Sequence, residues 1–283
     1  MKKVYLLLLV SLSFATFSQH TVTTILDSPT MDVDDALALD SQGNLYGSHF
    51  SGNTVYKITP SGVVTVFATG LQNPNGLAFD SNDNLYIVEY SGAAIHKYTI
   101  NGVLLNTYNV GGFPSGLIKD HNSDAMIYTN VVDSSINKLS EDGTISVIHQ
   151  GAPLNIPVGL AYSNNGDLYI GNFVGREIHR LKSNGTFKYI ATIPDSGTDF
   201  PFLAFIAYAN GRILATNYGE HKIYKVHPNK TDDVSIYSGS VNGNADGDIS
   251  QATYSYPSGI LASKSGKELY ISEFSGLGNI RKI

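Results

Sequence analysis

One motif recurs six times along this chain, at a spacing of roughly 40 residues that is typical of stacked β-repeats. Its clearest copies are residues 76–80 (Gly-Leu-Ala-Phe-Asp) followed by 84–86, and residues 159–162 followed by 167–169. The other copies begin near Ala36, Gly116, Ala204 and Gly259. Each copy predicts a small sheet that cannot bury its faces alone. Six such sheets are therefore expected to stack into a closed ring.

Alternation of apolar and polar residues predicts four strands in each copy. In the second copy they span residues 77–80, 85–89, 94–100 and 103–110, and the last two are joined by Asn101-Gly102, a hairpin signal. The sixth copy ends at Ile283, after its third strand, and residues 21–26 resemble a fourth strand. The prediction is an all-β, six-bladed β-propeller closed by an N-terminal strand that completes the last blade. Residues 240–254 are expected to form a polar surface loop.

The first 18 residues are interpreted as a signal peptide, because Lys2 and Lys3 precede a short apolar run. An uncleaved anchor is the alternative. Residues 19–283 are then one domain, secreted or periplasmic, and stabilised by packing because the chain has no cysteine. Without the leader, 16 basic residues stand against 24 acidic ones, a net charge of −8. This acidic balance argues against nucleic-acid partners and stable membrane insertion, and a monomer is expected.

Four copies open with Pro-x-Gly, at residues 74–76, 114–116, 157–159 and 257–259. With the strands that follow, these segments resemble NHL repeats, and the chain from about residue 20 to 283 resembles the senescence-marker-protein/gluconolactonase superfamily of six-bladed propellers. The resemblance implies a site at the channel mouth, where lactonases of that family hold a divalent cation with Glu, Asn and Asp side chains. Propellers of this type also include lyases and binding proteins.

Two sets of residues are expected at that mouth. The first occupies the pre-glycine position, directly before the repeat glycine or its equivalent: Asp35, Asn75, Ser115, Val158, Leu203 and Ser258. Of these, Asp35 and Asn75 have the oxygen chemistry that a hard cation prefers, so they are the candidate metal ligands, for Ca²⁺ or Mg²⁺ rather than Zn²⁺.

The second set ends each second strand: His49, Glu89, Asn130, Asn172, Asn217 and Glu273. A structural role in fixing the adjacent turns is one interpretation. The other starts from ring closure, which makes blades six, one and two neighbours. Glu273, His49 and Glu89 are then candidate catalytic residues that bind a metal or share acid–base work. Candidate ligand-binding residues are Asn130, Asn172, Asn217, Tyr90 and Phe274.

Two functions follow as hypotheses. The first is a binding or interaction scaffold that presents its channel face to a small molecule, a carbohydrate or a protein. The second is a metal-dependent sugar-lactone hydrolase or a lyase, with its site at the channel mouth. The sequence has no serine-hydrolase elbow, no dinucleotide fingerprint and no cysteine nucleophile.

Overall fold

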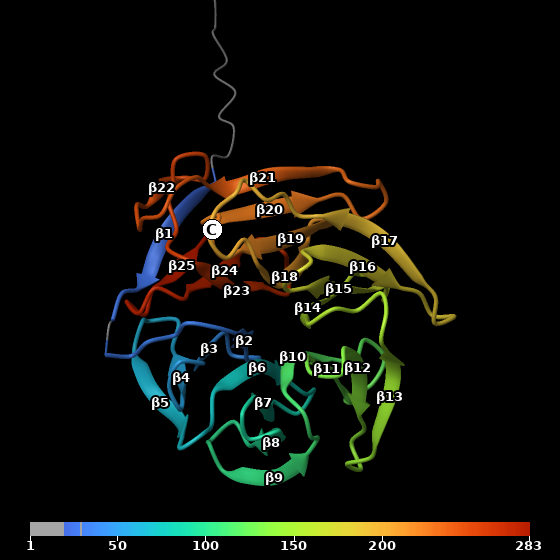
Figure 1. The fold of residues 1–283 in the computed structure, drawn as a ribbon. Coiled ribbons are helices and arrows are strands. Elements are labelled where there is room, and N and C mark those ends of the chain that lie inside the picture. The colour runs from blue at the N-terminus through green and yellow to red at the C-terminus, as the bar shows by residue number, and fades with distance from the viewer. Residues whose placement is uncertain (1–19, 29) are drawn as a thin grey trace, which may run out of the picture.

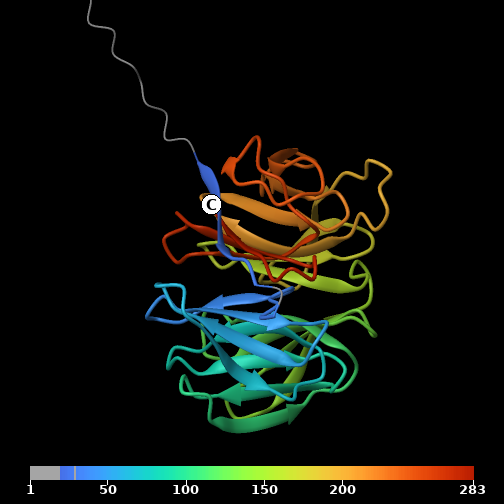
Figure 2. The same ribbon diagram turned by 90° about the vertical axis from the view of Figure 1, so that its left-hand side faces the viewer.

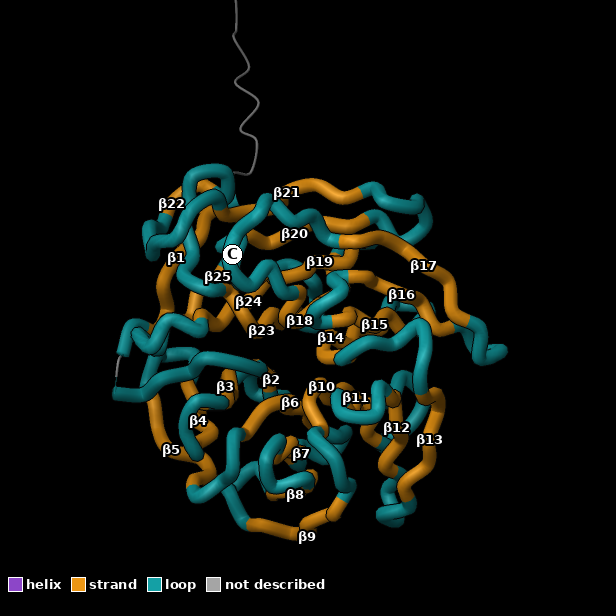
Figure 3. Tube along the Cα trace, viewed as in Figure 1, coloured by secondary structure: helices purple, strands orange, loops and turns teal. Residues whose placement is uncertain are grey.

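The computed structural model describes residues 20–28 and 30–283, and within these ranges it contains strands and loops but no helix (Figure 3). It follows that no described helix is long and apolar enough to cross a membrane. The predicted signal peptide, residues 1–18, lies outside the described residues.

Six antiparallel sheets surround a central channel (Figure 1). In each sheet the first strand lies against the channel and the last lies at the periphery. Blade one contains β2 (Leu37–Leu39), β3 (Leu45–His49), β4 (Thr54–Ile58) and β5 (Val64–Thr69). Blade two contains β6 (Pro74–Phe79), β7 (Leu85–Glu89), β8 (Ala94–Tyr98) and β9 (Leu104–Asn109). Blade three contains β10 (Pro114–Lys119), β11 (Met126–Asn130), β12 (Ser135–Leu139) and β13 (Ile145–Gln150).

Blades four and five repeat this order. Their strands are β14 (Pro157–Tyr162), β15 (Leu168–Asn172), β16 (Glu177–Leu181) and β17 (Phe187–Thr192); β18 (Leu203–Ala209), β19 (Arg212–Asn217), β20 (Lys222–Val226) and β21 (Val234–Gly239). The second copy shows how close the sequence-based strands are, since residues 85–89 were predicted without error and the other three differ by one to three residues at their ends.

Blade six is completed from the other end of the chain, as predicted. It contains β23 (Pro257–Ala262), β24 (Leu269–Glu273) and β25 (Ile280–Lys282), and β1 (Thr21–Leu26) pairs with β25 in an antiparallel register. Figure 2 shows the N-terminal strand running beside the C-terminal end. Val22 on β1 is completely buried, so the closure contributes apolar packing as well as hydrogen bonds.

The segment of residues 240–254 does more than form a surface loop. It supplies β22 (Gly247–Asp248), a short fifth strand on the outside of β1. Asp246 accepts hydrogen bonds from Thr24 and forms an ion pair with Arg281. Arg281 is fully buried and also pairs with Glu273, at 3.2 Å. This segment therefore covers the closing strand and supplies a charge partner beneath it.

The hydrophobic core is divided among the interfaces between blades. Between blades two and three, for example, Tyr86, Val88 and Ile95 pack with Met126 and Tyr128. Because each blade buries both faces against its neighbours, the inner strands are held in fixed positions around the channel.

Candidate functional site

A cavity of about 430 Å³ occupies the face of the ring where the first strands begin. We call it the mouth cavity. Its base is formed by side chains at the pre-glycine position of each blade, and four of them are polar. These residues are Asp35, Asn75, Ser115, Val158, Ala204 and Ser258.

Aromatic rings form the wall of the mouth cavity. Phe50 and Tyr90 meet edge to face with centroids 5.4 Å apart, and Tyr218 meets Phe274 in the same way at 5.7 Å. Across the cavity wall, Phe173 and Phe202 stack at 4.5 Å. Tyr90 and Phe274, two of the predicted ligand-binding residues, line this cavity, and their role in binding stays a prediction.

The wall follows from the two-residue period of a β-strand. Phe50, Tyr90, Phe173, Tyr218 and Phe274 each come directly after the polar residue that ends a second strand. Consecutive side chains of an extended chain point in opposite directions. Because the aromatic residue lines the cavity, the polar residue before it faces away, and none of the six lines the cavity.

Four of those six polar side chains instead hold the loop that enters their own blade. Each accepts a hydrogen bond from a backbone N–H 17 or 18 residues earlier in the chain. The four bonds are Gln72 N to Glu89 Oε1 (2.7 Å), Phe113 N to Asn130 Oδ1 (3.0 Å), Asn155 N to Asn172 Oδ1 (3.1 Å) and Ser255 N to Glu273 Oε1 (3.0 Å). Asn217 Nδ2 donates to the carbonyl of Pro194. These contacts match the structural interpretation of this set, and they place Asn130, Asn172 and Asn217 outside the mouth cavity.

The structure gives each predicted catalytic residue a separate partner. His49 Nε2 lies 3.7 Å from Asp32 Oδ2, His96 Nε2 lies 3.1 Å from Glu89 Oε2, and Glu273 pairs with Arg281. Among the described residues, no hydrogen bond or ion pair joins any two of Glu89, His49 and Glu273. Their catalytic role stays a prediction.

His49 belongs to a small group of ionisable side chains beside the mouth cavity. Ligand-type atoms of Asp32, Asp34 and His49 lie within 4.8 Å of one another. The Asp34 carboxylate accepts the backbone N–H groups of Phe50 and Ser51. Burial raises the pKa of Asp32 and of Asp34. This group fixes the backbone that carries Phe50 into the cavity wall.

The two predicted metal ligands, Asp35 and Asn75, both line the base of the mouth cavity. Ser258 Oγ donates to Asp35 Oδ1 at 2.8 Å. Burial, and then the neighbouring Asp34 carboxyl, raise the pKa of Asp35 well above its ordinary value of 3.8. Asn75 is 5% exposed, and its Oδ1 is buried with no hydrogen-bond partner among the described residues.

Residues 14–243 match the family model described as the Virginiamycin B lyase family. The chain belongs to this family. Among solved structures, virginiamycin B lyase from Staphylococcus aureus is 21% identical over 87% of this chain and 78% of its own, with a TM-score of 0.65. No curated protein matched the sequence.

Two other solved structures share the fold of this Virginiamycin B lyase family member. A gluconolactonase from Xanthomonas campestris is 17% identical over 92% of this chain and 88% of its own, with a TM-score of 0.69. An auxiliary nutrient binding protein from Bacteroides thetaiotaomicron is 13% identical over 94% and 76%, with a TM-score of 0.73. The predicted likeness to gluconolactonase-type propellers is confirmed at the level of the fold. The finer likeness to NHL repeats stays a prediction.

The base of the mouth cavity in this Virginiamycin B lyase family member does not fit a lactonase-type divalent cation. Calcium and magnesium sites are built from several oxygen ligands, with carboxylates prominent among them. Here Asp35 is the only carboxyl among the cavity-lining residues, and Val158 and Ala204 offer no side-chain oxygen. Metal binding by Asp35 and Asn75 therefore stays a prediction without support from the donor set.

One residue at the pre-glycine position was assigned incorrectly from the sequence. Leu203 pairs with Asn217 as Pro74 pairs with Glu89, so Ala204, not Leu203, corresponds to Asn75. Blade five has no Pro-x-Gly to mark the register. Counting back from Asn217 does not locate it either, because Ala204 lies 13 residues before Asn217 whereas the spacing in the other blades is 14 or 15.

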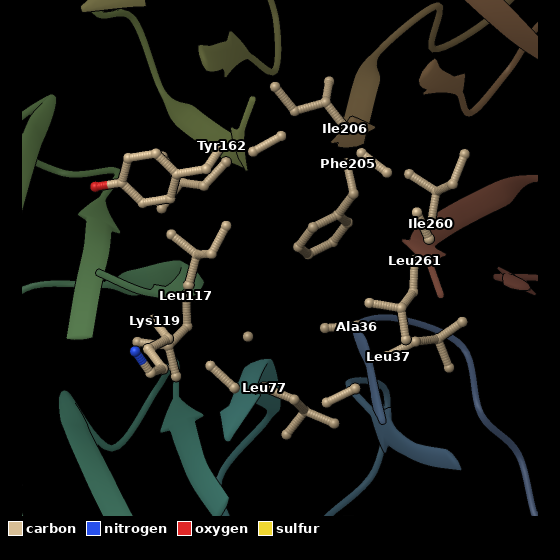
Figure 4. A pocket seen from close by; sticks show the side chains of 18 of the residues that line it. Ala36, Leu37, Leu77, Leu117, Lys119, Tyr162, Phe205, Ile206, Ile260 and Leu261 are labelled. Atoms are coloured by element: carbon tan, nitrogen blue, oxygen red, sulfur yellow. The ribbon is translucent and has the colours of Figure 1, made fainter. Parts of the chain in front are cut away.

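The same correction places Phe205 where the other blades have glycine or alanine. Phe205 lines the mouth cavity and also a second cavity of about 350 Å³ on the opposite side of the ring, here called the far cavity. Figure 4 shows its ring projecting into the channel from blade five. The ring packs against core clusters of blades five and six and of blades one and two. Phe205 therefore separates the two cavities and limits the depth of the mouth cavity.

Proposed function

We propose that this protein is a secreted or periplasmic small-molecule-binding propeller that takes its ligand into the mouth cavity. The observation that carries the proposal is the composition of the cavity: aromatic rings around a base with one buried carboxyl. A volume of about 430 Å³ is in the range of small-ligand sites. Nutrient-binding propellers among the structural neighbours support a binding role.

The test is isothermal titration calorimetry with a panel of small aromatic compounds and neutral sugars, each added to the protein lacking residues 1–18. At least one member is expected to bind, and Phe274→Ala is expected to weaken that binding about tenfold, the equivalent of about 1.4 kcal/mol for a lost ring contact. Tyr189→Ala removes a ring from the peripheral strand β17 and is the matched control. Equal binding by both variants would place the ligand elsewhere.

A second candidate is a lyase or lactone hydrolase acting at the same mouth, and membership of the Virginiamycin B lyase family favours it. The predicted residues for this activity are Glu89, His49 and Glu273. Melting with chelator, and then with Ca²⁺, Mg²⁺, Mn²⁺ or Zn²⁺, tests for a bound ion, because a ligand at 100 times its Kd stabilises the folded state by about 2.7 kcal/mol.

Activity is tested separately from metal binding. The protein is incubated with sugar lactones and with quinupristin, the compound present in a solved structure of catalytically inactive virginiamycin B lyase from Staphylococcus aureus, in the presence of each ion. Product formation that is lost in His49→Ala would favour the enzyme over the binding protein. Unchanged substrates and unchanged melting temperatures would leave the binding function.

A further inference from the structure

The polar residues at the base of the mouth cavity are gathered on one side. Blades six, one, two and three are consecutive in the ring, and they supply Ser258, Asp35, Asn75 and Ser115. The two remaining positions, Val158 and Ala204 on blades four and five, are apolar, and Phe205 extends this apolar side. A ligand that fits this base has one polar end and an apolar body.

Hydrogen-bond acceptors are among the groups left open on the polar side. Asn75 Oδ1 is buried and has no partner among the described residues. The Ser258 hydroxyl donates a hydrogen bond to Asp35 Oδ1, and among the described residues no side chain or backbone group donates to Asp35 Oδ2. A buried acceptor without a partner is unfavourable, because no hydrogen bond offsets its loss of hydration. A ligand that donates hydrogen bonds to both groups would remove this cost.

The charge of the cavity lining indicates what kind of hydrogen-bond donor the ligand carries. Asp35 is the one ionisable acid among the lining residues, and the lining contains no lysine, arginine or histidine. Asp35 is 6% exposed, and no cationic side chain lines the cavity to balance its carboxylate. An anionic ligand would meet Asp35 with no compensating charge. A cationic ligand would supply the missing counter-charge.

The wall suits the same chemistry. Phe50, Tyr90, Tyr218 and Phe274 stand above Asp35 and Asn75 in the same cavity. The faces of phenylalanine and tyrosine rings attract ammonium groups, and the attraction is strongest where water is excluded. The acidic net charge of the chain, −6 over all 283 residues, favours the approach of a cation.

We propose that the mouth cavity binds an organic ammonium compound, whose charged nitrogen donates to Asp35 and Asn75 while its apolar body packs against Phe173, Phe202 and Phe205. This inference rests on the proposed binding function and specifies the ligand class. It is independent of any metal, because an ammonium ion needs the hydrogen-bond acceptors and the charge but no coordination sphere.

The test uses four probes that share a phenyl ring: benzylamine, benzyl alcohol, toluene and benzoate. Calorimetry is performed at neutral pH with a chelator present. We expect benzylamine to bind about tenfold or more tightly than benzyl alcohol, because its ammonium group gains both an ion pair and a desolvated cation–π contact. Benzoate is expected not to bind.

Variants tie the preference to the base of the cavity. Asp35→Asn keeps the shape of the side chain and removes its charge, and is expected to abolish the preference for benzylamine over benzyl alcohol. Asn75→Leu is expected to weaken benzylamine more than toluene. Asp199→Asn removes one exposed carboxyl and is the control, expected to bind all four probes as the parent does.

The outcomes separate the ligand class from the binding function. If benzyl alcohol or toluene binds as tightly as benzylamine, or if Asp35→Asn keeps the preference, the ammonium inference is wrong and the binding function stands. If none of the four probes binds and the wider panel also fails, both are wrong.

Discussion

Asp35→Asn is expected to stabilise the free protein at neutral pH while leaving its fold unchanged. In the native structure the Asp35 side chain is buried, and its one hydrogen bond from another side chain, among the described residues, comes from Ser258. Burial raises the pKa of Asp35 well above 3.8, so the folded protein holds this proton at pH values where the unfolded chain has released it. Asparagine has nearly the same shape and cannot ionise.

Proton linkage determines the sign and size of the effect of Asp35 on the free energy of unfolding. A folded-state pKa above the unfolded value means that the folded state binds more protons than the unfolded state. The free energy of unfolding therefore falls as pH rises. Between the two pKa values the loss is about 1.4 kcal/mol per pH unit, and above the folded-state pKa it reaches a plateau. The stability contributed by the Asp35 proton is therefore complete below about pH 4 and is lost as pH increases through the raised pKa.

Urea unfolding at half-unit steps from pH 4 to pH 8 measures this effect as the difference between Asp35→Asn and the parent. Buried Asp34 and Glu273, whose pKa values are also raised by burial, are present in both proteins, so most of their contribution cancels. The difference should widen with pH in favour of the variant, whereas Asp199→Asn should track the parent. A difference that stays constant from pH 4 to pH 8, or a variant that is less stable at neutral pH, would refute the reasoning.

Three further predictions concern closure of the ring and division of the channel, and urea unfolding measures the stability change in each. Val22→Ala on β1 should lower the free energy of unfolding by about 2 kcal/mol, because two buried methyl groups are lost and a small void is left. Thr23→Ala, at an exposed position of the same strand, should lower it much less. Equal losses in the two variants would contradict the closure model. Arg281→Met should lower the free energy of unfolding by about 3–5 kcal/mol, because Glu273 is left without its buried partner. Adding Glu273→Gln should restore part of the lost stability. No restoration would argue against the ion pair as the cause of the loss. Phe205→Ala should join the mouth and far cavities and lower the free energy of unfolding by about 2 kcal/mol, which is less than the loss expected for a fully buried ring. A longer ligand should then bind more tightly. Unchanged selectivity for ligand length would argue that the ring is no barrier between the cavities.

The architecture was predictable because its signals are repeated. Six copies of one strand pattern, with Asn-Gly and related turns, each give the same evidence, so an error in one copy is corrected by the others. The missing fourth strand of blade six pointed directly to residues 21–26, and the structure pairs them with β25. By contrast, β22 is two residues long and pairs only because β1 offers an open edge, which no local pattern reveals.

The candidate site was predicted in part, and the difference has a geometric cause. The sequence interpretation placed both His49, Glu89 and Glu273 and the aromatic residues that follow them at the channel mouth. The polar residue ends each second strand, and the aromatic residue is the first one beyond it and points to a different side. Because Phe50, Tyr90 and Phe274 line the cavity, the preceding residues turn outward and bond to the loops of their blades. The period of two was visible in the sequence, and applying it at the ends of the second strands would have separated the two sets.

The direction of the Phe205 side chain could not be predicted from the repeat pattern, although this side chain lines both cavities of the channel. At the same position in blades two, three and six, an added Cβ would come within 2.4 Å of a backbone oxygen of the next blade, so these glycines are required by blade packing. Blade five is followed by Ser258 of blade six, and there Phe205 stands in place of the glycine, with its ring turned into the channel (Figure 4). A repeat pattern shows that the glycine is missing, but the direction of the replacing side chain depends on the whole ring. The residue that departs from the repeat thus lies between the mouth cavity and the far cavity and limits the depth of the former.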